Sequence, residues 1–341
     1  SRGLGDVYKR QDEAYNNSEI NDQLPELLKG CDRVFYPVGK NAGLDQNIIE
    51  WIKTAKSKDR HSSAIDIADA TSKVGNQRLI KDPHEIDLMK KACRISAESH
   101  VEAMKFVKPG MTEQEMEAFY LYEFAKRGGR FSAYTPIVAG GENACVLHYV
   151  ENSKPLLDGD LLLVDAGCEY NFYASDITRT FPVSGKFTDA QLAIYEVVLE
   201  AESKAIAAVS VNNNVMDAQI ISEKVVTQGL IDLGILKGSL DDLHAKGAFK
   251  EFYMHKIGHW LGIDVHDAGD YMEDDQFMQF KPGMVTTIEP GIYIPSSANV
   301  DDKWKGIGIR IEDDILVTPD GNENLTEFVP SDPKEIEALM A

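Results

Sequence analysis

Hydrophobic residues recur at spacings of three and four through a polar stretch that begins near residue 82, a pattern typical of an amphipathic helix. The apolar stripe consists of Ile86, Met89, Cys93, Ala97, Val101 and Met104. Asp82 suits the N-cap of such a helix, Pro83 its first position, and Glu85 completes a capping box. The pattern therefore predicts a long helix that begins at residue 83.

Three further helices are expected along the chain. Thr112 and Thr188 are each followed three residues later by Glu or Gln and then by an apolar-periodic run, and residues 216–236 form a fourth such run. Short stretches typical of strands lie between and after these helices. We therefore predict an α+β fold for residues 80–341, with helices packed on a curved, largely antiparallel sheet.

The first 79 residues show a different pattern of hydrophobic and polar positions. Residues 12–79 mix short apolar runs with one expected helix at residues 44–57, which indicates part of a small α/β unit. Residues 1–11 have neither an apolar core nor a clear periodicity, and we interpret them as a scar or a truncated start, with a native, irregular N-terminus as the alternative. The predicted domains are thus a truncated α/β domain at 1–79 and a second domain at 80–341.

An internal repeat lies within the second domain. "GDLLLVDAG" at residues 159–167 and "GMVTTIEPG" at residues 283–291 align without a gap, which places Asp165 and Glu289 at equivalent positions. The match is short, but it favours two structurally similar halves.

Composition narrows the possible partners. The 341 residues are 43% hydrophobic and 27% charged, as in soluble globular proteins, and carry a formal charge of −21. Such a charge disfavours nucleic acid and anionic membranes, and no apolar run reaches the length of about 20 residues that a transmembrane helix needs. The four cysteines form no C-x-x-C pair, which favours reduced thiols and a cytoplasmic protein.

Two acids interrupt stretches that otherwise predict buried strands. Leu161–Val164 runs directly into Asp165, and Asp176 interrupts the next β-like stretch. A turn centred on Tyr170 and Asn171 would place the two carboxylates directly opposite each other, where like charges repel. A shared proton, a nearby Arg or Lys, or a bound cation could relieve this repulsion. Arg179 is expected to face the other side of the strand, and a solvated hairpin tip is the alternative.

The second half of the chain adds two more acids. Glu289 ends a β-branched run, and Glu312 lies on an alternating strand that turns it to the same side as Arg310. Asp313 and Asp314 directly follow Glu312 and are expected to be rim carboxylates, although the run of three acids leaves the choice of ligand open.

Three histidines lie in one short segment, "HKIGHWLGIDVHDAG", at positions 255, 259 and 266. The spacing of the first two matches that of a zinc-protease helix, but no Glu follows His255 and Gly258 interrupts the segment, so that motif is absent. Lone histidines are most often structural, whereas three in a chain with four candidate acids favour a functional site.

Charge and ligand chemistry then point to metal ions. Two Asp and two Glu carry four negative charges, which two divalent ions would neutralise. A set of oxygen ligands with one imidazole suits Mn²⁺, with Co²⁺, Fe²⁺ or Zn²⁺ able to replace it. Two such ions about 3.5–4 Å apart can hold a bridging hydroxide and polarise a carbonyl, which is the chemistry of amide hydrolysis.

The stretches "VDAG", "ASDITRTFP", "HKIGHWLGIDVHD", "TTIEPGIYI" and "GIRIEDDI" resemble the metallopeptidases of the pita-bread fold, most closely the bacterial Xaa-Pro aminopeptidases. The resemblance spans about residues 78–341. It implies a pita-bread fold, with a curved antiparallel sheet, helices and two pseudo-symmetric halves. The metal ligands that it implies are Asp165, Asp176, His259, Glu289 and Glu312.

The resemblance also implies a role for each ligand. Asp165 would bind one ion, and Asp176 and Glu312 would bridge both. His259 and Glu289 would bind the other ion, and Glu289 would also carry the proton from the bridging water to the leaving nitrogen.

The remaining implied residues lie on the substrate side. His266 matches a histidine that stabilises the tetrahedral intermediate, His148 one that contacts substrate, and His255 one that lines the proline pocket. Arg310 and Tyr293 match positions that support the ligands or contact substrate.

The resemblance implies a dinuclear-metal aminopeptidase that removes the first residue from peptides with proline second. The rival hypotheses are a prolidase that cleaves Xaa-Pro dipeptides and a non-catalytic, peptide-binding module of the same fold; metal-free creatinase-like chemistry is disfavoured because all five ligands are present.

Two departures from the family pattern stand out. Gly258 occupies the place of the family's Ser before "HWLG", which weakens the distinction from prolidase. The family's N-terminal α/β domain is matched only in its latter half, and in the family that domain assembles dimers or tetramers. A homo-oligomer is therefore expected only for a complete domain.

Overall fold

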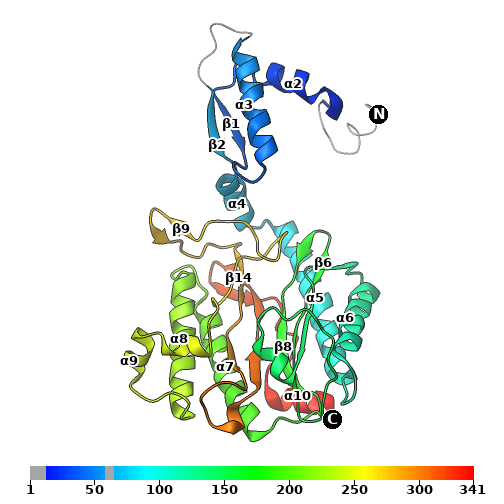
Figure 1. The fold of residues 1–341 in the computed structure, drawn as a ribbon, viewed down its shortest axis with the longest axis vertical. Helices are drawn as coiled ribbons and strands as arrows, with labels where there is room; N and C mark the ends of the chain where they lie inside the picture. The colour runs from blue at the N-terminus through cyan, green and yellow to red at the C-terminus, as the bar shows by residue number, and fades with distance from the viewer. Residues whose placement is uncertain (1–12, 58–64) are drawn as a thin grey trace. The chain divides into compact units, whose positions relative to one another are not determined.

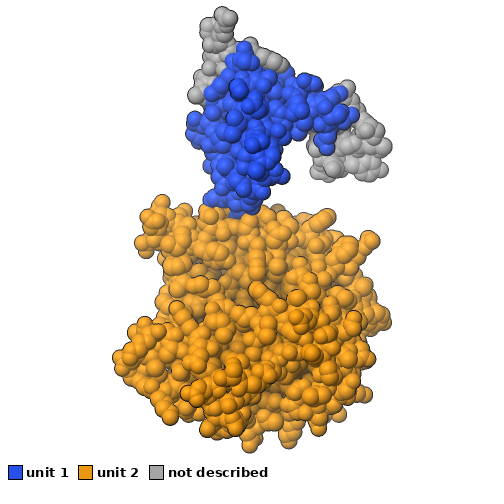
Figure 2. All heavy atoms as spheres, viewed as in Figure 1, with its two compact units in different colours: residues 1–75 blue, residues 76–341 orange. Residues whose placement is uncertain are grey.

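The computed structural model describes residues 13–57 and 65–341, which fall into two compact units, residues 1–75 and 76–341 (Figure 2). The change of unit lies inside α4 (Thr71–Leu79), a few residues before the boundary expected from the sequence. The first unit holds η1 (Asn17–Glu19), α2 (Ile20–Leu27), β1 (Arg33–Tyr36), α3 (Ala42–Ser57) and β2 (Asp66–Asp69). Its two strands pair in parallel, and Ile48, Trp51 and Ile52 of α3 form its small core with Tyr36.

The second unit combines helices with short strands, which confirms the α+β prediction (Figure 1). Its longer helices are α5 (Pro83–Phe106), α6 (Glu113–Arg127), α7 (Asp189–Ala208), α8 (Val215–Asp232), α9 (Leu240–Ala245) and α10 (Pro333–Met340), with 3-10 turns η2 (Gly141–Cys145), η3 (Ala248–Glu251) and η4 (Asp302–Trp304). Its strands are β3 (Phe131–Ser132), β4 (Ile137–Gly140), β5 (Leu161–Asp165), β6 (Cys168–Tyr170), β7 (Tyr173–Ala174), β8 (Thr178–Pro182), β9 (Met272–Glu273), β10 (Gln276–Phe277), β11 (Val285–Ile288), β12 (Gly291–Ile294), β13 (Ile307–Arg310), β14 (Asp313–Thr318) and β15 (Gly321–Asn324). None of the helices in the described part of the chain is long and apolar enough to cross a membrane.

The helices begin where the capping signals predict. Asp82, Thr112 and Thr188 each cap a helix and form a capping box with the residue three positions on. Asn214 caps α8 in the same way. Hydrogen bonds between residues two or three positions apart therefore mark the starts of these helices.

The two halves of the second unit repeat one strand pattern. In the first half the outer strands β5 and β8 pair around the inner hairpin β6–β7, and in the second half β11 and β14 pair around β12–β13. In Figure 1, α5 and α6 lie beside the strands of the first half, and α7 lies beside those of the second, with α8 packed against α7. The repeat in the sequence thus corresponds to a repeat in the structure, with β5 and β11 as its equivalent strands.

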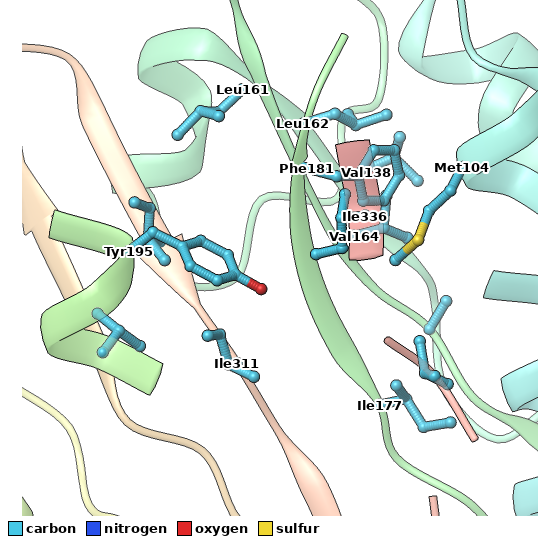
Figure 3. Packing of buried hydrophobic residues seen from close by; sticks show 14 of the residues in the cluster. Met104, Val138, Leu161, Leu162, Val164, Ile177, Phe181, Tyr195, Ile311 and Ile336 are labelled. Carbon is cyan, nitrogen blue, oxygen red and sulfur yellow. The ribbon is translucent and has the colours of Figure 1, made fainter. Parts of the chain in front are cut away.

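A continuous apolar core holds these layers together. Leu162, Val164 and Phe181 from β5 and β8 pack with Met104 of α5, and Ile311 lies on the other side of the sheet (Figure 3). Full burial of one such side chain contributes about 1.5–3 kcal/mol. The run at 161–164 is buried on both faces, so Asp165 is the last residue of a strand that is packed into the core.

Candidate metal centre and substrate cavity

The hairpin that carries the first two acids turns at Asn171 and Phe172, one residue later than expected. Both residues have positive φ, 48° and 74°, as the central pair of a type I′ turn requires. Asp165 consequently pairs with Thr178 and not with Asp176, so the expected register was wrong. A turn that lies one residue later moves the cross-strand partner of Asp165 by two residues, from Asp176 to Thr178. Because side chains alternate with a period of two, Asp176 keeps its face and becomes the diagonal neighbour of Asp165.

The backbone beside these acids is packed tightly. A Cβ atom on Gly167 would lie 1.8 Å from the carbonyl oxygen of Ser175, so only glycine allows this approach. From α5, Ser96 accepts a hydrogen bond from the Cys168 amide at 2.9 Å, and His100 Nε2 donates to the Ala166 carbonyl at 2.9 Å. Helix α5 therefore fixes the chain between the two aspartates.

The second half presents its acids at the end of its own ladder. Ile288 pairs with Asp313 at the end of the β11–β14 ladder, so Glu289 and Glu312 are the residues that adjoin this last pair. A β-bridge between Thr178 and Glu312 joins the two halves, and the Thr178 hydroxyl donates to Glu312 Oε2 at 2.6 Å. The four acids meet where the two repeated strand sets touch.

His259 completes this cluster. Its Nε2 lies 3.4 Å from Asp176 Oδ2 and 3.7 Å from Glu289 Oε1. One ligand atom each from Asp176, His259 and Glu312 lie within 4.8 Å of one another. The backbone before His259 packs as tightly as that at Gly167. A Cβ atom on Gly258 would lie 1.9 Å from the Thr287 carbonyl oxygen.

The neighbouring acids Asp313 and Asp314 point elsewhere, and because both are buried, the expectation that they are rim carboxylates was wrong. Asp313 accepts a hydrogen bond from Arg179 at 2.7 Å, and Asp314 accepts one from the Asp176 amide at 3.0 Å and one from the Cys93 thiol. Arg179 thus faces away from the first two aspartates, as expected. The structure brings only Glu312 of the three consecutive acids into the cluster.

Arg310 provides a positive charge to the cluster. Its Nη2 lies 2.6 Å from Asp165 Oδ2, its Nε donates to Thr178, and its Nη1 donates to the Tyr293 hydroxyl at 3.1 Å. The second Asp165 oxygen, Oδ1, is buried and has no hydrogen-bond partner in the described part of the chain. One of the four carboxylates is therefore only half satisfied by the protein.

The electrostatic environment disfavours four ionised acids. Burial, and then the charge of Asp165, raise the pKa of Asp176, and burial raises the pKa of Glu312 well above its usual range. Burial also raises the pKa of Glu289 to about 7. Burial lowers the pKa of His259, but the hydrogen bond and charge of Asp176 outweigh it and raise the value to about 9. These shifts have the sign that a crowded acid cluster produces, and cations relieve such crowding.

The cluster opens into a cavity of about 760 Å³. His148, His255 and His266 line it, together with Arg310 and all five candidate ligands. The His266 ring packs edge-on against that of His259, with 4.4 Å between centroids. His255 Nε2 lies 2.8 Å from the Tyr293 hydroxyl, and burial lowers its pKa to about 4.

Tyr293 is placed differently from the other predicted substrate residues. It is fully buried, and it lies behind the cavity wall, where its hydroxyl joins His255 to Arg310. This geometry supports the positions of those two side chains and does not present Tyr293 to a ligand.

Two residues around the ligands, Tyr134 and Thr178, were missed from the sequence, and a third, Asp314, was considered only as a rim carboxylate or an alternative ligand. The Tyr134 hydroxyl donates to Asp176 Oδ1 at 2.5 Å, and Thr178 and Asp314 make the contacts given above. The correct hairpin register would have identified Thr178, because it places this residue opposite Asp165. No local signal marks Tyr134, which reaches the site from the loop before β4.

Comparison with known proteins decides the family. A model of metallopeptidase family M24 matches residues 87–319. The chain belongs to metallopeptidase family M24. It is 46% identical over 328 residues to the Xaa-Pro aminopeptidase of Haemophilus influenzae, an alignment that covers 96% of this chain and 74% of that protein.

Solved structures of this M24 metallopeptidase's relatives agree with the fold. Pseudomonas aeruginosa aminopeptidase PepP superposes with a TM-score of 0.96 at 44% identity, over 100% of this chain and 78% of that one. Zinc-substituted Escherichia coli aminopeptidase P, in complex with product, gives 0.95 at 43% identity, with the same two shares of 100% and 78%. The expected pita-bread fold and metallo-aminopeptidase class are confirmed, and the family and its zinc-substituted relative support a divalent metal.

Proposed function

We propose that this M24 enzyme is an Xaa-Pro aminopeptidase that works with two divalent metal ions, Mn²⁺ being the physiological metal. The observation that carries the proposal is the convergence of four carboxylates and one imidazole, from both structural repeats, on the wall of a single cavity. The near relatives named above, all aminopeptidases, support the substrate class.

The residues fit a pair of hard cations. The proposed ligands are Asp165, Asp176, His259, Glu289 and Glu312. The free, buried Oδ1 of Asp165 is a ready acceptor position for a cation. Arg310 binds the other oxygen of Asp165, so two divalent ions more than offset the remaining negative charge of the four carboxylates and leave the site slightly positive. When bound, the ions supply a hydroxide nucleophile at neutral pH and polarise the scissile carbonyl.

The side chains at the cavity surface can carry out proton transfer and stabilise the reacting peptide bond. Glu289 lies between His259 and His255 at the cavity surface, where its carboxylate can take the proton of the attacking water and pass it to the leaving nitrogen. His266 and His148 face the same cavity and can donate hydrogen bonds to the oxygen atoms of the reacting peptide bond.

Proline in the second position explains the need for a dedicated cavity. The Xaa-Pro bond is a tertiary amide whose nitrogen carries no hydrogen, so an enzyme cannot hold it through that N–H. His255 is neutral at physiological pH because its pKa is lowered to about 4. A neutral ring beside Tyr293 forms a wall that accommodates the apolar pyrrolidine ring.

The test compares metal states and substrates. Hydrolysis of an Xaa-Pro tripeptide should vanish after chelation and return with Mn²⁺, with metal content measured in parallel. A chelator-resistant activity would refute the proposed mechanism. An Xaa-Pro dipeptide serves as the second substrate, since a strict preference for it would establish the prolidase alternative. Cytoplasmic location and oligomer formation remain predictions from the sequence.

A further inference from the structure

Glu113, the first residue of α6, is a buried carboxylate outside the metal cluster. Its Oε1 accepts hydrogen bonds at 2.8 Å from the Gly140 amide and the Asn143 side-chain amide. Its Oε2 accepts two more at 2.8 Å, from the Tyr149 hydroxyl and the Lys154 amide. The side chain is fully buried. Four neutral donors therefore converge on one anionic group.

This arrangement is costly unless all four bonds are made. Burial of an ionised carboxylate is strongly unfavourable without partners, and a charge-assisted hydrogen bond is roughly twice as strong as a neutral one. The buried Glu113 carboxylate therefore has its lowest free energy when all four donors are at their present positions. A loop that moved would leave the charge of Glu113 without compensation.

The four donors come from one continuous segment, the last residue of β4 (Gly140) and the loop that follows it to Lys154, which includes η2 and carries His148. The Glu113 amide also donates to the Lys154 carbonyl at 2.9 Å, so both ends of the loop are tied to the start of α6. His148 itself is exposed and lines the substrate cavity. An exposed side chain on an irregular loop depends on the loop for its position, and Tyr149, its immediate neighbour, is one of the four donors.

We propose that Glu113 is a positioning residue that holds His148 in the substrate cavity. The inference rests on the proposed function, in which His148 contacts the peptide. Glu113 does not touch the substrate; it acts through the loop. Correct placement matters because a displacement of about 1 Å at a reacting group can cost about 100-fold in rate.

The test is a double-mutant cycle with Glu113→Gln and His148→Ala. The Gln amide nitrogen would face two of the donors, so the loop must shift. We expect Glu113→Gln to lower kcat/KM for an Xaa-Pro tripeptide about tenfold at unchanged Mn²⁺ content. In the His148→Ala background the same substitution should change kcat/KM less than about twofold, because there is no longer a side chain to misplace. Additive losses in the cycle would refute the proposal.

The control variant is Glu123→Gln. Glu123 is another buried glutamate of α6, but it pairs with Arg127 and Lys126, away from the loop. It should lower the melting temperature and leave kcat/KM unchanged. An equal loss of kcat/KM in both variants would show a general effect of damage to α6 and would contradict the inference.

Two further outcomes are distinguishable. If Glu113→Gln does not fold, Tyr149→Phe can replace it, because that substitution removes only one of the four donors. The double-mutant cycle of Tyr149→Phe with His148→Ala then tests whether the loss of kcat/KM depends on the His148 side chain. If the wild-type enzyme hydrolyses no Xaa-Pro peptide, the proposed function fails first. If it is active and His148→Ala impairs it while Glu113→Gln and Tyr149→Phe do not, only the positioning role fails.

Discussion

Substitution of Lys81 by Met should destabilise the second unit because it breaks a buried ion pair. Lys81 Nζ lies 3.2 Å from Asp267 Oδ2, and both side chains are 2% exposed or less. Arg78 binds the other oxygen of the same carboxylate and also Asp264. Asp267 directly follows His266, so the pair anchors the loop that carries two of the cavity histidines.

The magnitude follows from geometry and burial. At 3.2 Å and an effective dielectric constant of about 20, the attraction between the two charges is about 5 kcal/mol before desolvation is counted. Loss of one partner from a buried pair typically costs about 3–5 kcal/mol, because the remaining charge stays buried. Arg78 still holds Asp267, so we expect a loss at the lower limit, about 3 kcal/mol.

Urea unfolding of the full chain measures this loss as a shift of the midpoint by about 1 M. The control is Lys90→Met. Lys90 also forms an ion pair, with Glu323 at 2.7 Å, but the two side chains are 42% and 47% exposed, so less than about 1 kcal/mol is expected. The double variant Lys81→Met, Asp267→Asn should recover part of the stability. Equal effects of the two lysine substitutions would refute the reasoning from burial.

Three further predictions follow from the site and its supports. Gly167→Ala would place a Cβ 1.8 Å from the Ser175 carbonyl oxygen, so the variant should lose about 2 kcal/mol or more of stability and most of its bound metal, measured by thermal unfolding and metal analysis; a wild-type melting temperature would contradict the packing described. Burial lowers the pKa of His100 to about 4 in the folded chain, below its ordinary value of 6.5. The contribution of His100 to the free energy of unfolding is therefore complete above pH 6.5 and is lost as the pH falls toward 4, by about 3 kcal/mol in all. His100→Gln should flatten that part of the stability profile, and an unchanged slope would show that other groups cause it. Glu289→Gln should bind metal weakly and lose most turnover per bound ion, and near-normal turnover would exclude Glu289 as the proton carrier.

Short-range features of this protein were readable from the sequence alone. The capping residues Asp82, Thr112 and Thr188 fix helix starts because their hydrogen bonds span only two or three residues. The repeat of nine residues identified equivalent strands, since β5 and β11 occupy matching places in the two halves. The residue types of the site were also evident, because buried-strand patterns that end in acids demand compensation.

Only the tertiary structure decided which groups meet. The hairpin turn is shifted by one residue, so Thr178, not Asp176, faces Asp165, although the period of two kept both acids on one face. Packing selected Glu312 over Asp313 and Asp314, and it brought Arg310 to Asp165 and Glu113 to the loop of His148. Caps and periodicity act between near neighbours in the chain, whereas these contacts join residues up to 145 positions apart in number, where the register and close packing of the two halves set the distances.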